Sequence, residues 1–166
     1  MKPSTPRLDI QPVSPEATHP HRQRWLRAHQ TLEQMELPGD RDADALHLIA
    51  RIASRVAGVA SVMRERPTAE TAPLGPATLR SPPGDWRLRA MACAPEHRRQ
   101  GIGAALLTRC AAHAQAHGGA ALWCQARIEA TPFYAQMGLE PLGEPFEVAG
   151  IGPHVFMWRS LRGGNG

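Results

Sequence analysis

Short stretches of alternating apolar and polar side chains recur along the chain, and a period of two predicts β-strands. In residues 86–93, Trp86 and Leu88 fall on one side while Arg87 and Arg89 fall on the other. Two continuous apolar runs, 45–50 and 56–63, are separated by a short polar link and predict a pair of neighbouring strands. Together these patterns predict strands at 7–11, 45–50, 56–63, 86–93, 120–126, 139–142 and 155–158.

Three stretches show helical features instead. Apolar residues recur every fourth position from about Ile102 to His117, and Gly118-Gly119 would end that helix. Ser14-Pro15 has the form of an N-cap followed by proline at the first helical position, although Pro20 predicts that the segment to about Leu26 is broken. A short helix is expected at Thr131–Tyr134, with Gly138 after it.

The order of these elements predicts a mixed α/β sheet with helices packed on it. At 166 residues the chain is large enough for one self-sufficient domain, expected over residues 7–161 with a frayed start at 1–6 and a flexible tail at 162–166. Residues 66–85 hold five prolines and two glycines, which predicts a long loop that is mobile or borders a binding site.

Composition narrows the possible partners. The chain is 42% hydrophobic and has no apolar run near the roughly 20 residues of a membrane span, so neither a membrane association nor a signal peptide is expected and a cytoplasmic location is predicted. The net charge of +4 suits an anionic ligand, but only 5% of residues are aromatic, so nucleic acid is not expected. Cys93, Cys110 and Cys124 are odd in number and far apart, which indicates free thiols and no metal site.

The run Arg98–Ala104 holds two arginines and two glycines directly ahead of the long helical pattern. Glycines allow a sharp turn and a close approach to the backbone, and a helix N-terminus offers unpaired N–H groups and a partial positive charge. The run therefore predicts an anion site whose expected guest is a diphosphate. The alternative at this point is a turn that only packs a helix against a strand.

Several motifs together resemble the GNAT superfamily of acyl-CoA-dependent N-acyltransferases, in its small bacterial members. Arg98, Gly101 and Gly103 match the family's pyrophosphate motif between a strand and a helix. A second signature and a closing strand are similar to Leu122-Trp123-Cys124-Gln125, Ala130, Phe133-Tyr134, Gly138-Leu139 and Gly152–Trp158. The resemblance implies a single-domain, mostly antiparallel sheet flanked by helices, splayed between the strands at 86–93 and 120–126.

The resemblance also assigns roles to particular residues. The backbone of Met91, Ala92 and Cys93, next to a β-bulge, would pair with pantetheine and the acetyl oxygen of acetyl-CoA. The diphosphate would be held by Arg98, Arg99, Gln100, Gly101, Ile102, Gly103 and Ala104. Gln125 stands where the family commonly has Asn, and Leu139 where it commonly has Phe.

Tyr134, the only tyrosine, occupies the position of the family's general acid, the alternative being a tyrosine that packs in the core. A general base cannot be chosen from the sequence, and the candidates are Glu33, Glu36, His47, Glu96 and His154. His47 is better explained as a core histidine with satisfied hydrogen bonds.

The predicted function is transfer of an acetyl group from acetyl-CoA to a primary amine, on a small molecule or a peptide, by direct attack in a ternary complex. A homodimer is possible. Two alternative hypotheses are a GNAT-shaped CoA-binding or regulatory module without turnover, and a protein that binds nucleotide phosphates. The acceptor would be chosen by residues 20–40 and 143–154, which carry no recognisable signature.

Overall fold

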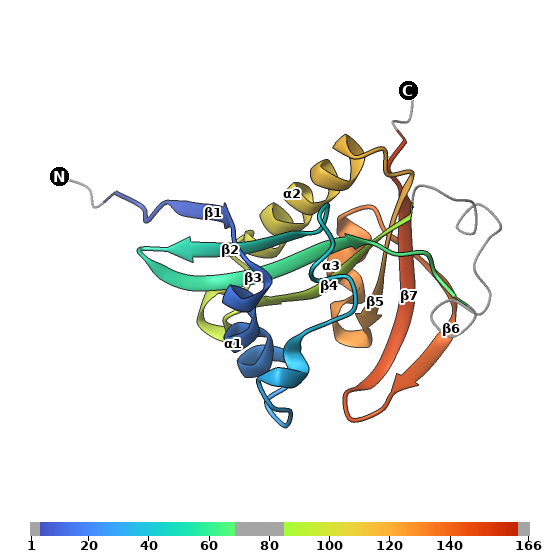
Figure 1. Ribbon diagram of the computed structural model, residues 1–166, viewed down its shortest axis with the longest axis horizontal. Helices are drawn as coiled ribbons and strands as arrows, with labels where there is room; N and C mark the ends of the chain where they lie inside the picture. The colour runs from blue at the N-terminus through green and yellow to red at the C-terminus, as the bar shows by residue number, and fades with distance from the viewer. Residues whose placement is uncertain (1–3, 69–84, 163–166) are drawn as a thin grey trace. The chain divides into compact units, whose positions relative to one another are not determined.

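The computed structural model describes residues 4–68 and 85–162. Its strands form one seven-stranded sheet in the order β1-β2-β3-β4-β5-β7-β6 (Figure 1). The elements are β1 (Leu8–Pro12), α1 (Pro15–Leu26), η1 (Glu33–Met35), β2 (Leu46–Ile52), β3 (Arg55–Arg64), β4 (Asp85–Cys93), η3 (Pro95–His97), α2 (Ile102–Ala116), β5 (Ala121–Arg127), η4 (Ile128–Ala130), α3 (Thr131–Gln136), β6 (Glu140–Val148) and β7 (Gly152–Ser160). The predicted mixed α/β class with a mostly antiparallel sheet is confirmed.

The chain divides into two compact units, and β3, β4 and α2 each run through both. The first unit comprises Met1–Ser61 and Ala90–Cys110, and the second comprises Val62–Arg89 and Ala111–Gly166. Most of the predicted loop at 66–85 lies outside the described residues, as do the first three and last four residues of the chain. No helix in the described ranges is long and apolar enough to cross a membrane.

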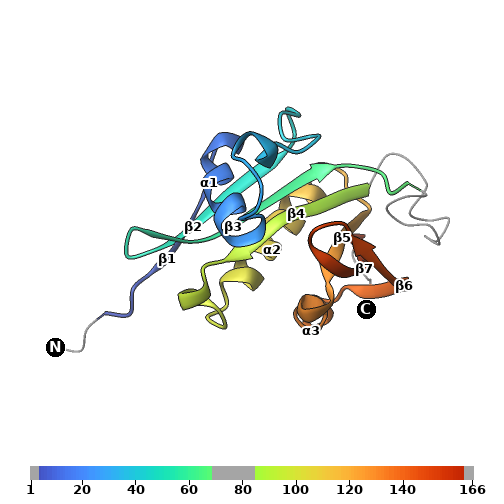
Figure 2. The same cartoon turned by 90° about the horizontal axis from the view of Figure 1, so that it is seen from below.

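In the first unit, β1 pairs antiparallel with β2, and α1 lies against β2 (Figure 2). The two predicted apolar runs are the neighbouring strands β2 and β3, joined at Ala53 and Ser54. Both joining residues have positive φ angles, 50° and 70°, as a tight hairpin of the type I′ form requires. Leu48 and Val59 lie fully inside, so these strands supply core to this unit.

Helix α1 corrects one expectation from the sequence. It runs without interruption from Pro15 to Leu26 even though Pro20 lies inside it. A proline inside a helix removes the hydrogen bond that its own N–H would have made one turn back, and its ring crowds the carbonyl of that residue. Burial of Thr18 and Arg22 holds the helix against its surroundings, so packing outweighs the local penalty of the proline.

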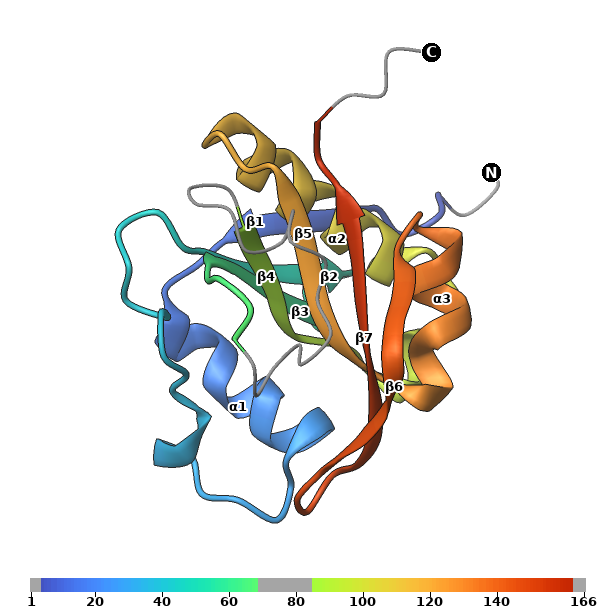
Figure 3. The same ribbon diagram turned by 90° about the vertical axis from the view of Figure 1, so that its right-hand side faces the viewer.

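In the second unit, β5 pairs antiparallel with β7, and β7 pairs antiparallel with β6 (Figure 3). Trp123 and Phe156 stack with their ring centroids 5.3 Å apart, and Leu142, Phe146 and Trp158 pack against this cluster. Helix α3 contacts β5 and β6. Trp123 also donates its indole N–H to the carbonyl of Glu65 at 2.8 Å, which ties the end of β3 to this unit's core.

The expected stripe along α2 is confirmed, because Ile102, Leu106, Cys110 and Ala114 are all at most 2% exposed. The helix ends where predicted, with Gly118 in the left-handed region at φ 80°. All three cysteines are free thiols. For the two buried ones, burial raises the pKa of Cys110 and of Cys124 to about 12, so both are neutral core residues.

Strand β4 departs from the strict alternation expected over residues 86–93. Ala90 has a φ of 51°, in the left-handed region that residues other than glycine seldom adopt. Trp86, Arg87 and Leu88 are all buried, whereas residues 89–93 are half-buried. A single left-handed residue within a strand shifts the direction of the side chains that follow, so the predicted two-sided pattern ends at Ala90.

Candidate acyl-CoA site

The predicted anion site at Arg98–Ala104, called the cradle below, is a turn that leads directly into the N-terminus of α2. After η3, Arg98 is extended, Arg99 and Gly101 have φ angles of 61° and 81°, and the helix begins at Ile102. The first helical hydrogen bond joins the Ala105 N–H to the Gly101 carbonyl at 3.1 Å. The N–H groups before Ala105 have no acceptor one turn back, so the helix presents them at its open end.

The chemistry of this turn suits an anion. Residues 98–101 are exposed, and the two arginine side chains add positive charge to the helix N-terminus. Consecutive backbone N–H groups near a left-handed residue form concavities that bind anions. A diphosphate could therefore be held here by backbone N–H groups and by Arg98 together.

Cys93 lies beside this turn. The Gly103 N–H and the Arg98 guanidinium are both close enough to the Cys93 sulfur to favour a lower pKa of its thiol. Burial raises the pKa of the Cys93 thiol, outweighing the opposite effects of Arg98 and the Gly103 N–H. The end of β4 and the first turn of α2 therefore lie next to each other, and the Cys93 side chain there is a neutral thiol.

Gly58 of β3 sets how closely α2 approaches the strands. A Cβ atom at this position would lie 3.0 Å from side-chain atoms of Ile102 and Leu106, and 3.2 Å from the carbonyl oxygen of Ala92. The Ala94 N–H also donates to the Ala57 carbonyl at 2.8 Å. Because only glycine leaves this space, the first turn of α2 packs directly against β3 at Gly58.

The pairing of β4 with β5 is short and parallel. The register joins Asp85–Arg87 to Ala121–Trp123, while both strands continue beyond it, to Cys93 and Arg127. Ala90, with its left-handed backbone, follows this paired stretch within β4. The sequence resemblance implied a β-bulge next to the predicted pantetheine-binding residues Met91, Ala92 and Cys93, and the left-handed Ala90 lies directly before them.

Gln125, in the second unit, is engaged by Arg87. The Arg87 guanidinium donates to the Gln125 amide oxygen at 3.1 Å and to a Glu65 carboxylate oxygen at 2.7 Å. It also lies over the ring of Trp123, 4.7 Å from the centroid. The amide of Gln125 is therefore oriented by a buried arginine, which the sequence did not identify.

Tyr134 lies on α3 and is 8% exposed, with its ring edge-on to Phe133 at a centroid separation of 5.1 Å. Gly138, with a φ of 84°, ends the helix as predicted, and the Leu139 N–H donates to the Tyr134 carbonyl. The structure therefore gathers the predicted cradle residues 98–104 with Met91, Ala92 and Cys93 in the first unit, and Gln125 with Tyr134 in the second.

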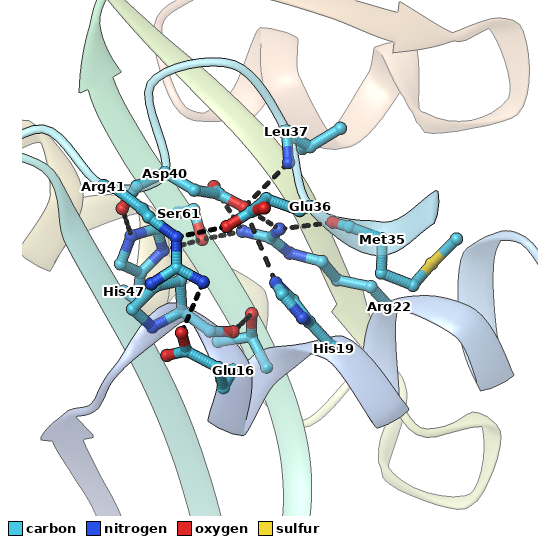
Figure 4. A network of polar contacts seen from close by, with 12 residues as sticks. Glu16, His19, Arg22, Met35, Glu36, Leu37, Asp40, Arg41, His47 and Ser61 are labelled. Atoms are coloured by element: carbon cyan, nitrogen blue, oxygen red, sulfur yellow. Dashed lines mark hydrogen bonds and ion pairs between the residues drawn. The ribbon is translucent and has the colours of Figure 1, made fainter. Parts of the chain in front are cut away.

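His47, one of the candidate bases, belongs to a buried polar network in the first unit (Figure 4). Its Nε2 donates to the Asp40 carbonyl at 2.8 Å, and its Nδ1 is 2.7 Å from the hydroxyl of Ser61. Burial lowers the pKa of His47, so the ring is held neutral. With both nitrogens occupied, His47 is the core histidine expected from the sequence.

Arg22 is the centre of the same network. Its guanidinium donates to both oxygens of Asp40, to the Met35 carbonyl and to the Ser61 hydroxyl. For Asp40, burial favours a higher pKa, but the hydrogen bonds from Arg22 and the Leu37 N–H outweigh it and hold the pKa below its usual value. The network fastens α1, β3 and the segment between α1 and β2.

The sequence analysis also did not identify Gly58 and Arg22, and of these two only Gly58 has a recognisable sequence feature. Gly58 interrupts an apolar strand pattern, and an isolated glycine inside a strand indicates a close backbone approach. Arg22 had no such signal, because its partners Asp40 and Ser61 lie 18 and 39 residues away in the sequence.

Comparison with known proteins agrees with this architecture. The family model of the acetyltransferase (GNAT) domain matches residues 13–160. The chain is 33% identical over 156 residues to the uncharacterized N-acetyltransferase YitI of Bacillus subtilis, covering 93% of this chain and 97% of YitI. This protein belongs to the GNAT acetyltransferase family.

Solved structures show the same fold at low sequence identity. Ard1 from Thermoplasma volcanium superposes with a TM-score of 0.68 at 17% identity, covering 92% of this chain and 97% of Ard1. An aminoglycoside 6′-N-acetyltransferase complexed with coenzyme A superposes with a TM-score of 0.64 at 11% identity, covering 93% of this chain and 98% of that one. The GNAT fold and the acetyltransferase class predicted from the sequence are confirmed.

Proposed function

We propose that this acetyltransferase moves an acetyl group from acetyl-CoA to a primary amine, which attacks the thioester directly in a ternary complex. The observation that supports this most is the turn at Arg98–Ala104, where left-handed residues, exposed arginines and the open end of α2 provide an anion site. A relative named as an N-acetyltransferase and a similar fold complexed with coenzyme A agree with it.

In this proposal the residues divide the work as the resemblance implies. Arg98 and the backbone of residues 99–104 bind the diphosphate, and the backbone of Met91–Cys93 holds the pantetheine arm and the acetyl oxygen. Gln125, whose amide oxygen is fixed by Arg87, presents its amide nitrogen toward the cofactor. Tyr134 protonates the departing thiolate, because expelling a bare thiolate in a partly dry site is electrostatically costly.

The acceptor is a primary amine on a small molecule or a peptide. Residues 20–40 and 143–154 select it, and in the first of these segments the Arg22 network fixes the positions of Met35, Leu37 and Asp40. A panel of primary amines, with release of CoA thiol as the readout, tests the reaction and identifies the class of acceptor. If none of them releases thiol faster than buffer alone does, the proposed function is wrong.

The Tyr134→Phe variant tests the acid, because it removes the hydroxyl and keeps the ring. Turnover is expected to fall by about 10²- to 10⁴-fold while acetyl-CoA affinity, measured by calorimetry, stays nearly unchanged. Unchanged turnover would make Tyr134 a packing residue. Arg98→Ala is the complementary variant, since it should weaken acetyl-CoA binding and leave the chemistry of the bound complex in place.

A further inference from the structure

His154 is a buried histidine at a defined place in the second unit. It lies on β7, where its Cα is paired with Arg127 of β5 and with Phe146 of β6. The residue is 6% exposed, and its ring stacks on Phe146 with centroids 6.2 Å apart. Strands on both sides therefore hold the imidazole in a fixed plane.

One hydrogen bond sets the tautomer of this ring. Nδ1 of His154 is 2.8 Å from the carbonyl oxygen of Gly152, and a carbonyl can only accept, so Nδ1 carries the hydrogen. In the neutral imidazole the lone pair is then on Nε2. No described residue hydrogen-bonds Nε2. The ring thus offers a basic nitrogen that the protein has oriented and left unused.

The position of His154 relates it to two residues of the proposed site. Residues paired directly across antiparallel strands point to the same face, as do alternate residues of one strand. Gln125 and Arg127 alternate on β5, so His154, opposite Arg127, shares the face of Gln125. The same end of β5 continues through η4 into α3, which carries Tyr134, and η4 contacts both β7 and α3.

The other candidate bases are less suited. Both nitrogens of His47 are hydrogen-bonded within the network, and Glu36 pairs with Arg41. Glu33 and Glu96 are exposed carboxylates on short 3-10 turns in the first unit. Among the candidate bases, only His154 combines burial, a fixed ring and a basic atom without a described hydrogen-bond partner in the unit that holds Tyr134.

We propose that His154 is the general base of the acetyl transfer, an inference that rests on the proposed function. Nε2 takes one proton from the acceptor ammonium, R–NH3+, and so produces the neutral amine. The amine nitrogen bonds to the acetyl carbon, and the C–S bond breaks. Tyr134 gives its proton to the departing thiolate and regains one from the new amide nitrogen, and the imidazolium of His154 releases its proton to water.

The charged groups of the neighbouring elements bear on how this base behaves. They are Arg127 on β5, Glu129 on η4 and Glu147 on β6. The test must therefore read the pH dependence of the reaction and not only its rate.

The decisive variant is His154→Asn, because the asparagine amide can still donate to the Gly152 carbonyl but has no basic nitrogen. The readout is kcat/KM for an accepted amine between pH 5.5 and 9.5. At neutral pH we expect a loss of about 10²- to 10⁴-fold, no acid limb from an enzyme base, and recovery toward high pH where the amine is already neutral. Acetyl-CoA affinity by calorimetry should be unchanged.

The matched control is His117→Asn, which removes an exposed histidine directly after α2 and should leave the profile as it is. His154→Gln is the second variant if the asparagine protein does not fold by circular dichroism. An unchanged profile in the folded variant, or an equal loss at every pH, would overturn the assignment and leave the proposed function standing. No thiol release by the unsubstituted protein with any amine would overturn both.

Discussion

The guanidinium of Arg22 and the carboxylate of Asp40 form a bidentate pair with N–O distances of 2.6 and 3.0 Å. Their side chains are 3% and 1% exposed, so the pair is sealed from solvent. Arg22 comes from α1 and Asp40 from the segment before β2, and neither charge could be buried without the other. The segment proposed to select the acceptor is thus held by a pair that must form as a whole.

Asp40→Asn should therefore destabilise the protein by about 3–5 kcal/mol, because it leaves the guanidinium buried without a counter-charge. Urea unfolding followed by circular dichroism measures the change. The matched control is Arg41→Ala, which breaks exposed pairs with Glu16 and Glu36 and should change stability little. Equal effects of the two substitutions would contradict the structural role of the buried pair.

His47 makes the stability of the network depend on pH. Burial lowers its pKa from the ordinary 6.5, so the unfolded chain binds a proton more readily than the folded protein does. The stabilisation from neutral His47 is present above pH 6.5 and is lost as the pH falls below it. The stability advantage of the unsubstituted protein over His47→Asn should therefore shrink from pH 7.5 to pH 5.5. An advantage that grows on acidification would contradict this sign.

Asp85 should behave in the opposite way. It is 5% exposed, neither of its carboxylate oxygens has a hydrogen-bond partner among the described residues, and burial raises its pKa to about 6, against a smaller effect of Arg66. Folding then favours the protonated acid, and this contribution is lost as the pH rises through about 6. Asp85→Asn should stabilise the protein by roughly 1–3 kcal/mol at pH 8 and by less at pH 5. Thermal unfolding at the two pH values checks this, and an equal gain at both would refute it.

Gly58→Ala should affect acetyl-CoA binding from a position outside the cradle. The added methyl group would meet Ile102 and Leu106 at 3.0 Å and push the first turn of α2 away from β3. Overpacking of this kind costs about 1–3 kcal/mol of stability, and the dissociation constant for acetyl-CoA should rise because the cradle moves with the helix. Ala112→Val, which enlarges an exposed side chain on the same helix, is the control. Unchanged affinity in Gly58→Ala would show that the cradle does not depend on this contact.

Local features of the sequence were enough for most elements. The stripe from Ile102 to Ala114 and the glycine after it defined α2, because helical periodicity and left-handed caps depend on neighbours in sequence. The prediction of a broken helix at Pro20 was wrong because the cost of a proline is visible in the local sequence, whereas the burial that offsets this cost depends on the fold. The network of Arg22, Asp40 and Ser61 could not be predicted, since pairing across 18 and 39 residues depends on the finished fold.

The candidate site shows the same division. Arg98, Gly101 and Gly103 were recognisable because a diphosphate needs consecutive backbone groups. The choice among the bases was not possible from the sequence, because His47 and His154 are alike until their hydrogen bonds are known. One has both nitrogens occupied, and the other has one free.

The left-handed backbone of Ala90 interrupts the alternation of side chains along β4, so the two ends of this strand face different neighbours. Ala90 is also the residue at which the strand passes from the second unit to the first. Before Ala90, Arg87 contacts Glu65, Gln125 and Trp123, and after Ala90, Cys93 lies close to the Gly103 N–H. In a strand with unbroken alternation, the face of every side chain would be fixed by that of the first residue. The strained alanine frees the last residues of β4 from the pattern imposed by the first ones.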